Sequence, residues 1–193
     1  MALIASAQSS GPKETCPAGV HDAVCAFVED LGHEYSEMYK NWNRKVVICW
    51  EINEPMSDGK PFMLSKRYTL SLGKKANLLK DVQGWRGKNF TDAELAGFDL
   101  EVLRGKQCQL QVIHNEKEGK VYANIISVLP KGKNSPAIAV VNKDVPKWIA
   151  EQKAKNDAAF AKSDHAPIII ADDDAEHAPQ VPVGDDGAPQ PPF

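Results

Sequence analysis

The chain has 193 residues, 42% of them hydrophobic, and a formal net charge of −3 at pH 7. This length favours one domain with additional segments over two full domains. No stretch approaches the roughly 20 apolar residues of a membrane-spanning helix, and residues 1–10 lack the basic start and apolar core of a signal peptide. We therefore expect a cytoplasmic protein. The four cysteines show no spacing typical of zinc binding or of a disulfide framework.

The first half of the chain predicts three strands. Residues 1–18 are small and polar, and we expect them to be flexible. Residues 20–34 fit a strand better than a helix, since β-branched residues recur and Gly32 interrupts the run. In residues 45–52 the apolar side chains alternate and place Trp50 on the core face. A third strand is expected over residues 63–72.

Helices and a hairpin follow. Apolar residues at a spacing of three predict a helix over residues 74–84, and Thr91 with Glu94 forms a capping box that opens a second helix. Alternating residues at 107–115 and 121–129, on either side of Gly119, predict a β-hairpin. Residues 143–162 predict a terminal helix, with Trp148 attaching it to the core.

This order predicts a mainly β, OB-fold-like five-stranded barrel, in which a helix lies between the third and fourth strands. Other small barrels and α+β sandwiches have the same order. The predicted organisation is a flexible N-terminus (1–18), an OB-fold-like core (19–142), a C-terminal helix (143–162) and a disordered acidic tail (163–193).

Charge is distributed unevenly along the chain. Residues 1–162 hold 23 basic and 19 acidic side chains, whereas residues 163–193 hold seven acidic side chains and no lysine or arginine. A basic body with an acidic tail indicates a nucleic-acid partner, although an acidic tail that only increases solubility is an equal alternative from charge alone.

Cations and aromatic rings are interleaved, as a protein that binds single-stranded DNA requires: cations contact phosphates and rings stack on bases. Trp42 has polar neighbours in sequence and is the best stacking candidate. The rings of Tyr68 and Trp85 also admit structural roles in the core and at the end of a helix. The candidate DNA-binding residues are Trp42, Arg44, Lys45, Lys66, Arg67, Tyr68, Trp85, Arg86, Lys88, Tyr122 and Lys131.

The tail resembles that of bacterial single-stranded DNA-binding proteins, because aspartates precede a final Pro192-Phe193. The resemblance implies docking on replication or recombination proteins, with an aromatic ring in a pocket and acids that attract the partner. Gly187–Pro191 separates the acids from the final pair, where that family places them almost adjacent. The candidate partner-binding residues are Asp185, Asp186, Pro192 and Phe193.

Residues 19–132 are similar to a family of small phage proteins encoded among replication and recombination genes. The segments of this sequence that carry the similarity are Trp50-Glu51-Ile52, Gly59-Lys60-Pro61-Phe62, Ser65-Lys66-Arg67-Tyr68-Thr69, Trp85-Arg86-Gly87, Phe90-Thr91, Gly97-Phe98-Asp99-Leu100, Gly105-Lys106-Gln107-Cys108 and Tyr122-Ala123-Asn124-Ile125. The resemblance implies an OB-fold-like single-stranded DNA-binding protein with Lys66, Arg67, Trp85 and Arg86 near its site.

The sequence predicts neither an enzyme nor a cofactor, because no phosphate-binding loop, nucleophile motif or metal-ligand cluster is recognisable. The hypothesis is sequence-independent binding of single-stranded DNA in phage replication or recombination. The sequence leaves open whether the chain forms a homo-oligomer. One alternative is a protein–protein adaptor or recombinase loader that does not touch DNA. A more distant one is a Mg²⁺-dependent nuclease that uses Glu51, Glu54 or Asp58.

Overall fold

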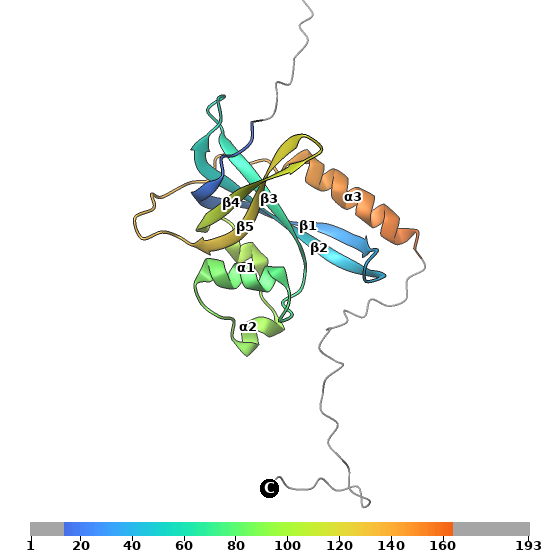
Figure 1. The fold of residues 1–193 in the computed structure, drawn as a ribbon. Helices are drawn as coiled ribbons and strands as arrows, with labels where there is room; N and C mark the ends of the chain where they lie inside the picture. The colour runs from blue at the N-terminus through green and yellow to red at the C-terminus, as the bar shows by residue number, and fades with distance from the viewer. Residues whose placement is uncertain (1–13, 164–193) are drawn as a thin grey trace, which may run out of the picture.

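A computed structural model describes residues 14–163, in which a five-stranded antiparallel sheet predominates (Figure 1). The elements are β1 (Gly19–Ser36), β2 (Asn41–Pro55), β3 (Pro61–Thr69), α1 (Asn77–Arg86), α2 (Asp92–Ala96), a 3₁₀ turn (Leu100–Leu103), β4 (Gln107–Lys117), β5 (Lys120–Pro130) and α3 (Lys147–Ala161). The fold is therefore mainly β, as predicted, and residues 20–34 are a strand rather than a helix. The expected flexible N-terminus and acidic tail lie largely outside the described residues.

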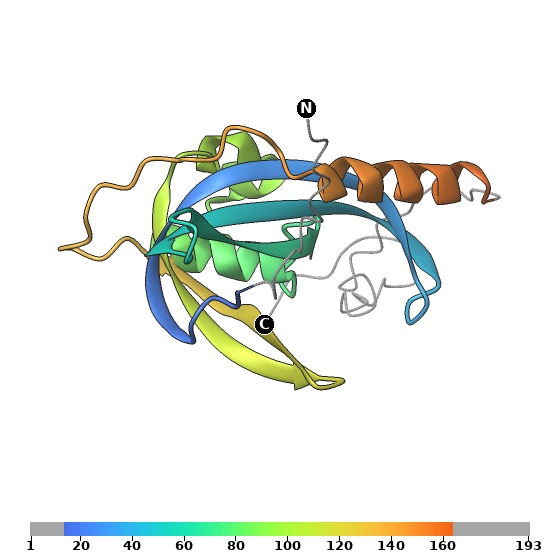
Figure 2. The ribbon, with the colours of Figure 1, turned by 90° about the horizontal axis from the view of Figure 1, so that it is seen from above.

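The strands lie in the order β3-β2-β1-β4-β5, and every neighbouring pair is antiparallel. Strands β1 and β2 are long and curved (Figure 2). This curvature brings the two edge strands, β3 and β5, close to one another. Within residues 14–163 no hydrogen-bonded ladder joins them, so the sheet is not closed into the expected barrel.

The main core lies on the concave side of the sheet. Val46, Ile48, Trp50 and Ile52 of β2 are all at most 4% exposed, which confirms the face predicted from their alternation. Helix α1 covers this face with Leu78, Leu79, Val82 and Trp85. The helix begins and ends slightly later than predicted, and Gly87 terminates it in the left-handed conformation, at φ 64°. The predicted capping box of Thr91 and Glu94 opens α2.

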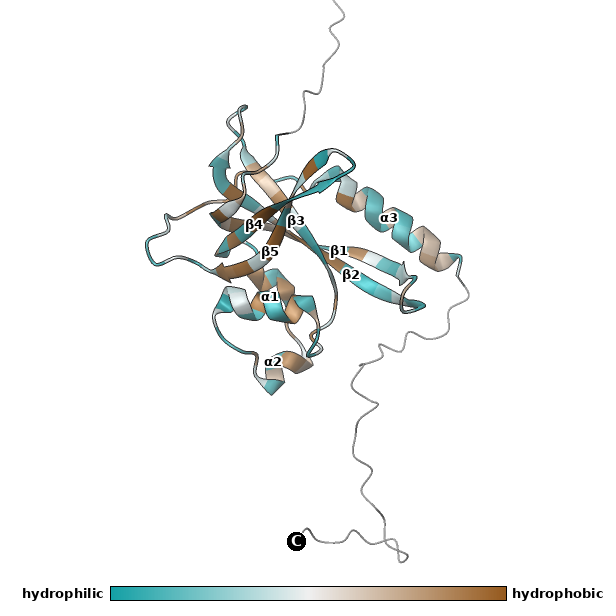
Figure 3. Ribbon diagram, viewed as in Figure 1, coloured by the Kyte–Doolittle hydropathy of each residue, from teal (hydrophilic) through white to brown (hydrophobic). Residues whose placement is uncertain are grey.

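A second, smaller core lies on the opposite side of β1 and β2. Phe27, Leu31 and Val47 are buried there beneath Ile149 and the half-buried Trp148 of α3. Trp148 thus attaches the terminal helix to the sheet, as predicted. The rest of α3 is mostly hydrophilic (Figure 3), because it buries little besides Ile149 and Asn156. Strands β1 and β2 therefore have buried side chains on both faces.

Helix α3 approaches the backbone of β1 most closely at Gly32. The Asn156 side-chain amide donates a buried hydrogen bond of 2.7 Å to the Leu31 carbonyl oxygen. A Cβ atom at Gly32 would overlap the Asp157 carboxylate, and Gly32 adopts φ 70°. Glycine is required here for both reasons.

The connection between β5 and α3 (residues 131–146) is held against the sheet by Glu51. This carboxylate is 1% exposed. It accepts hydrogen bonds from the backbone N–H groups of Val141 (2.7 Å) and Asn142 (2.6 Å), and from the Asn142 side-chain amide (2.7 Å). Because the connection leads directly into α3, Glu51 helps to place that helix over the sheet.

Candidate nucleic-acid interface

A cluster of aromatic rings lies where the β1–β2 hairpin meets the end of α3. The Trp42 ring centroid lies 5.4 Å from that of Tyr35 and 5.2 Å from that of Phe160, edge to face in the second pair. Phe160 also stacks on His33 at 4.2 Å. Trp42 was expected to lack apolar neighbours, but α3 supplies one from a distant part of the chain. The ring is consequently half-buried and held in one orientation.

The two elements that carry most of these rings also carry cations, Arg44 and Lys45 on β2 and Lys153 on α3. Arg44 is exposed and pairs with Asp30 at 3.2 Å, and the Lys45 ammonium donates to the Thr69 hydroxyl at 2.9 Å. Although burial by itself raises the pKa of Asp30, hydrogen bonds from Arg44 and from the Gly32 N–H hold it below its ordinary value. Lys153 of α3 pairs with Asp157, which raises the pKa of the lysine. Arg44 and Lys153 interact electrostatically, so the two elements contribute charge to one region.

The turn of the same hairpin carries further exposed side chains. Met38 is 81% exposed and Tyr39 is 67% exposed. Lys40 adopts a left-handed conformation, at φ 52°, which forms the tight turn. Sequence reasoning places Tyr39 in the same cation-rich stretch as Trp42 but misses Tyr35 and Phe160. Phe160 could have been recognised from the sequence, because it is the one aromatic residue in the second half of a polar helix and such a ring needs a packing partner.

The β4–β5 hairpin presents a second exposed ring. Tyr122 is 48% exposed and lies directly opposite Asn115. With His114, Lys117 and Asn124 these residues line a shallow depression of about 770 Å³. Figure 2 shows the ends of the β1–β2 and β4–β5 hairpins extending from the sheet toward the same side of the molecule.

Tyr68 and Trp85 do not belong to this surface, which corrects the expectation that their rings are open to bases. Tyr68 is 3% exposed, and its hydroxyl donates to Asp81 of α1 at 2.8 Å. Burial and the Asp81 carboxylate raise the pKa of Tyr68. Trp85 is 6% exposed, packs against Trp50 and donates its indole N–H to the Gln107 carbonyl at 2.9 Å. Both rings are core residues, and stacking on a base would require them to leave it.

Lys66 and Arg67 point to opposite sides of β3, as neighbours in a strand do. Lys66 lies on the concave side and pairs with Asp81 at 2.6 Å. Arg67 lies on the convex side, where its guanidinium carbon is 5.3 Å from the Trp148 ring centroid. Because α3 and residues 131–146 cover the convex side of β2, that face is not an open binding surface.

The remaining predicted cations are at the end of α1. Arg86 pairs with Glu94, and its guanidinium lies over the rings of Phe90 (4.4 Å) and Phe98 (5.1 Å), so it is engaged within the protein. Lys88 and Lys131 are exposed and follow Gly87 and Pro130, two residues that approach each other closely. The structure thus groups Trp42 with Arg44 and Lys45, and Lys88 with Lys131, while Tyr122 lies on a separate hairpin.

The three carboxylates of the nuclease alternative are held in separate interactions. Glu51 is buried and bound to residues 141 and 142. Glu54 contacts the His21 ring nitrogen at 2.6 Å, and Asp58 pairs with Lys60 at 3.4 Å. Among residues 14–163 no group of three or more His, Cys, Asp or Glu side chains is arranged to hold a metal ion.

The predicted partner-binding residues Asp185, Asp186, Pro192 and Phe193 lie outside the described residues. In the part of the chain that is described, no helix has both the length and the apolar character needed to cross a membrane. The chain matches no protein-family model, and the search of curated proteins found no match.

Proposed function

We propose that the protein binds single-stranded DNA without sequence preference, in phage replication or recombination. The observation that carries the proposal is the ring cluster of Tyr35, Trp42 and Phe160. Arg44 and Lys45 lie on the same strand as Trp42, and Lys153 lies on the same helix as Phe160. Such a cluster offers a stacking platform beside phosphate-binding charges. Each stacked base contributes on the order of 1–3 kcal/mol.

The strand order supports an OB-fold-like interpretation of the sheet. β1 is paired with both β2 and β4, and α1 lies between β3 and β4 in the chain, as in that fold. OB-folds bind oligonucleotides on the face of strands 2 and 3 and with the loops between strands 1 and 2 and between strands 4 and 5. Here the first turn of α3 and the connection before it cover part of the first of these surfaces, so the proposed contacts are concentrated on the two hairpins.

The proposed surface is tested by titration with oligo-dT while tryptophan fluorescence is recorded. Trp50 and Trp85 are buried, and Trp148 packs under Arg67, so quenching should come mainly from Trp42. Trp42→Phe should lose most of the quenching but bind nearly as tightly as the unchanged protein. Affinities of the Trp42 variants are therefore read from the fluorescence anisotropy of a labelled oligo-dT. Trp42→Ala should weaken binding roughly 5- to 100-fold, the equivalent of one lost stacked base.

Two controls make the titration specific. Val102→Ala changes an exposed apolar residue of the 3₁₀ turn, which belongs to neither hairpin, and should leave affinity unchanged. Affinity should also fall steeply between about 50 and 200 mM salt, because phosphate contacts release counterions. Absence of binding at the lower salt concentration, in a protein whose circular dichroism shows it folded, would reject the proposal.

The acidic tail is proposed to recruit replication or recombination proteins through Asp185, Asp186, Pro192 and Phe193. Deleting residues 185–193 should leave affinity for oligo-dT equal or tighter, because acidic charge is removed, and should abolish capture of partners from nuclease-treated extracts. A chain that captures partners through its tail but leaves oligo-dT unbound would instead be the adaptor considered above.

A further inference from the structure

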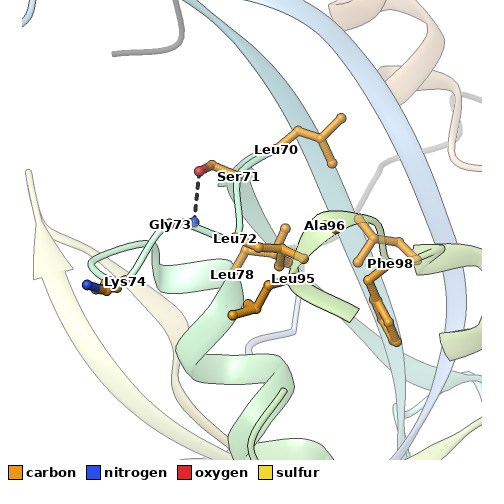
Figure 4. Close-up of a pocket in the computed structure, with 10 residues that line it drawn as sticks. Leu70, Ser71, Leu72, Gly73, Lys74, Leu78, Leu95, Ala96 and Phe98 are labelled. Atoms are coloured by element: carbon orange, nitrogen blue, oxygen red, sulfur yellow. Dashed lines mark hydrogen bonds between the residues drawn. The ribbon is translucent and has the colours of Figure 1, made fainter. Parts of the chain in front are cut away.

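An apolar groove lies beside the first turn of α1, at the margin of the main core, between residues 70–76, which join β3 to α1, and the segment of α2 and the 3₁₀ turn. Its volume is about 630 Å³. Leu70 and Leu95 on its two walls are 37% and 41% exposed, and Leu72 and Phe98 are half-buried. Figure 4 shows Leu72, Leu78 and Leu95 converging at the centre of the groove and Lys74 at one end. Within residues 70–76, the Gly73 N–H donates a hydrogen bond to the Ser71 hydroxyl.

Basic side chains lie at one end of this groove, and acidic ones lie on the segment that forms its opposite wall. Lys74 lines one end and Lys75 follows it, and both are exposed. The segment that forms the opposite wall carries two exposed acids, Asp92 at the start of α2 and Asp99 before the 3₁₀ turn. A ligand that matches the groove would therefore be apolar along its length and acidic only where it meets the two lysines.

The chain itself contains such a segment beyond the described residues. Ile168, Ile169 and Ile170 form an apolar triplet, and Asp172, Asp173 and Asp174 follow it after one alanine. The triplet begins five residues after Ser163, which ends the described chain. A short tether keeps its local concentration near the body high. We propose that residues 168–174 dock in this groove of the same chain, with the isoleucines against Leu72, Leu95 and Phe98 and the aspartates beside Lys74 and Lys75.

This inference does not depend on DNA binding. It assigns the two halves of the tail different tasks: residues 168–174 bind the protein's own surface, and residues 185–193 remain for the proposed partners. Lys74 and Lys75 would then partly neutralise the negative charge of residues 172–174.

The contact can be tested by disulfide formation in the full-length chain. The four native cysteines are buried and unpaired, so cysteines introduced at exposed positions should react selectively. The test variant carries Leu95→Cys and Ile169→Cys. A body control pairs Ile169→Cys with Val121→Cys on the β4–β5 hairpin, which Figure 1 places away from α2. A tail control pairs Leu95→Cys with Ala188→Cys.

Mild oxidation should give an intramolecular disulfide in the test variant about tenfold faster than in either control. Adding Lys74→Glu and Lys75→Glu to the test variant should slow it toward the control rates. Equal rates in all three variants would overturn the proposal. A product of dimer mass would show a neighbouring chain's tail in the groove, and faster reaction of the Ala188→Cys variant would show the far end of the tail there; either result also overturns it.

Discussion

Replacing Glu51 by glutamine should destabilise the protein more than replacing Glu54, the other carboxylate of β2, by glutamine. The Glu51 carboxylate is fully buried and accepts three hydrogen bonds, all shorter than 2.8 Å, from residues 141 and 142. Glutamine keeps one oxygen but turns an NH₂ group toward one of these donors. At least one N–H then loses its partner in a site that excludes water.

The magnitude follows from these contacts. A hydrogen bond to a charged group contributes about 1.5–3 kcal/mol, and an orphaned buried donor costs a similar amount. We therefore expect Glu51→Gln to lower the free energy of unfolding by about 3 kcal/mol, which for a domain of this size corresponds to roughly 6–12 °C in Tm. Glu37→Gln is the matched control, since Glu37 is 81% exposed and pairs only with the exposed Lys40; it should change stability by less than about 0.5 kcal/mol.

Urea unfolding followed by circular dichroism measures both variants, and hydrogen exchange locates the effect. The amides of Val141 and Asn142 should exchange faster in Glu51→Gln, because their acceptor is lost. If Glu51→Gln were as stable as Glu37→Gln, with unchanged exchange at these two amides, Glu51 could not be the residue that holds the connection to α3.

Three further results are expected. Asp81→Asn should lower stability by about 2 kcal/mol, because Lys66 and the buried Tyr68 hydroxyl share one Asp81 oxygen; a melting temperature equal to that of the unchanged protein would contradict this. Asp30, whose pKa is lowered by Arg44 and Gly32, stabilises the fold above its unfolded pKa of about 3.9, and this contribution disappears as pH falls through its folded pKa. The stability difference between the unchanged protein and Asp30→Asn, measured by urea unfolding, should therefore shrink on acidification, and a constant difference would refute the assignment. Burial raises the pKa values of the native thiols, so a maleimide at about pH 8 should label them only after urea is added; labelling of the folded protein would disagree with their burial. The thiols are Cys16 (about 11), Cys25 (about 12), Cys49 (about 12) and Cys108.

The order of strands and helices could be predicted from the sequence because it depends on local patterns. Alternation of period two placed Trp50 in the core, and the capping box of Thr91 and Glu94 satisfies its hydrogen bonds within four residues. Trp148 could be predicted to attach α3 to the sheet because a lone large apolar ring at the start of a polar helix has few other places to go.

The composition of the candidate site depended on contacts between residues far apart in the chain, which local patterns do not encode. Asp81 of α1 accepts a hydrogen bond from the Tyr68 hydroxyl, the Gln107 carbonyl accepts one from the Trp85 indole, and Phe160 packs on Trp42 across more than a hundred residues. A ring next to a cation in sequence can equally be part of the core or part of a surface. Only the curvature of the sheet and the packing of α1 and α3 on it decide which, because they determine where water is excluded.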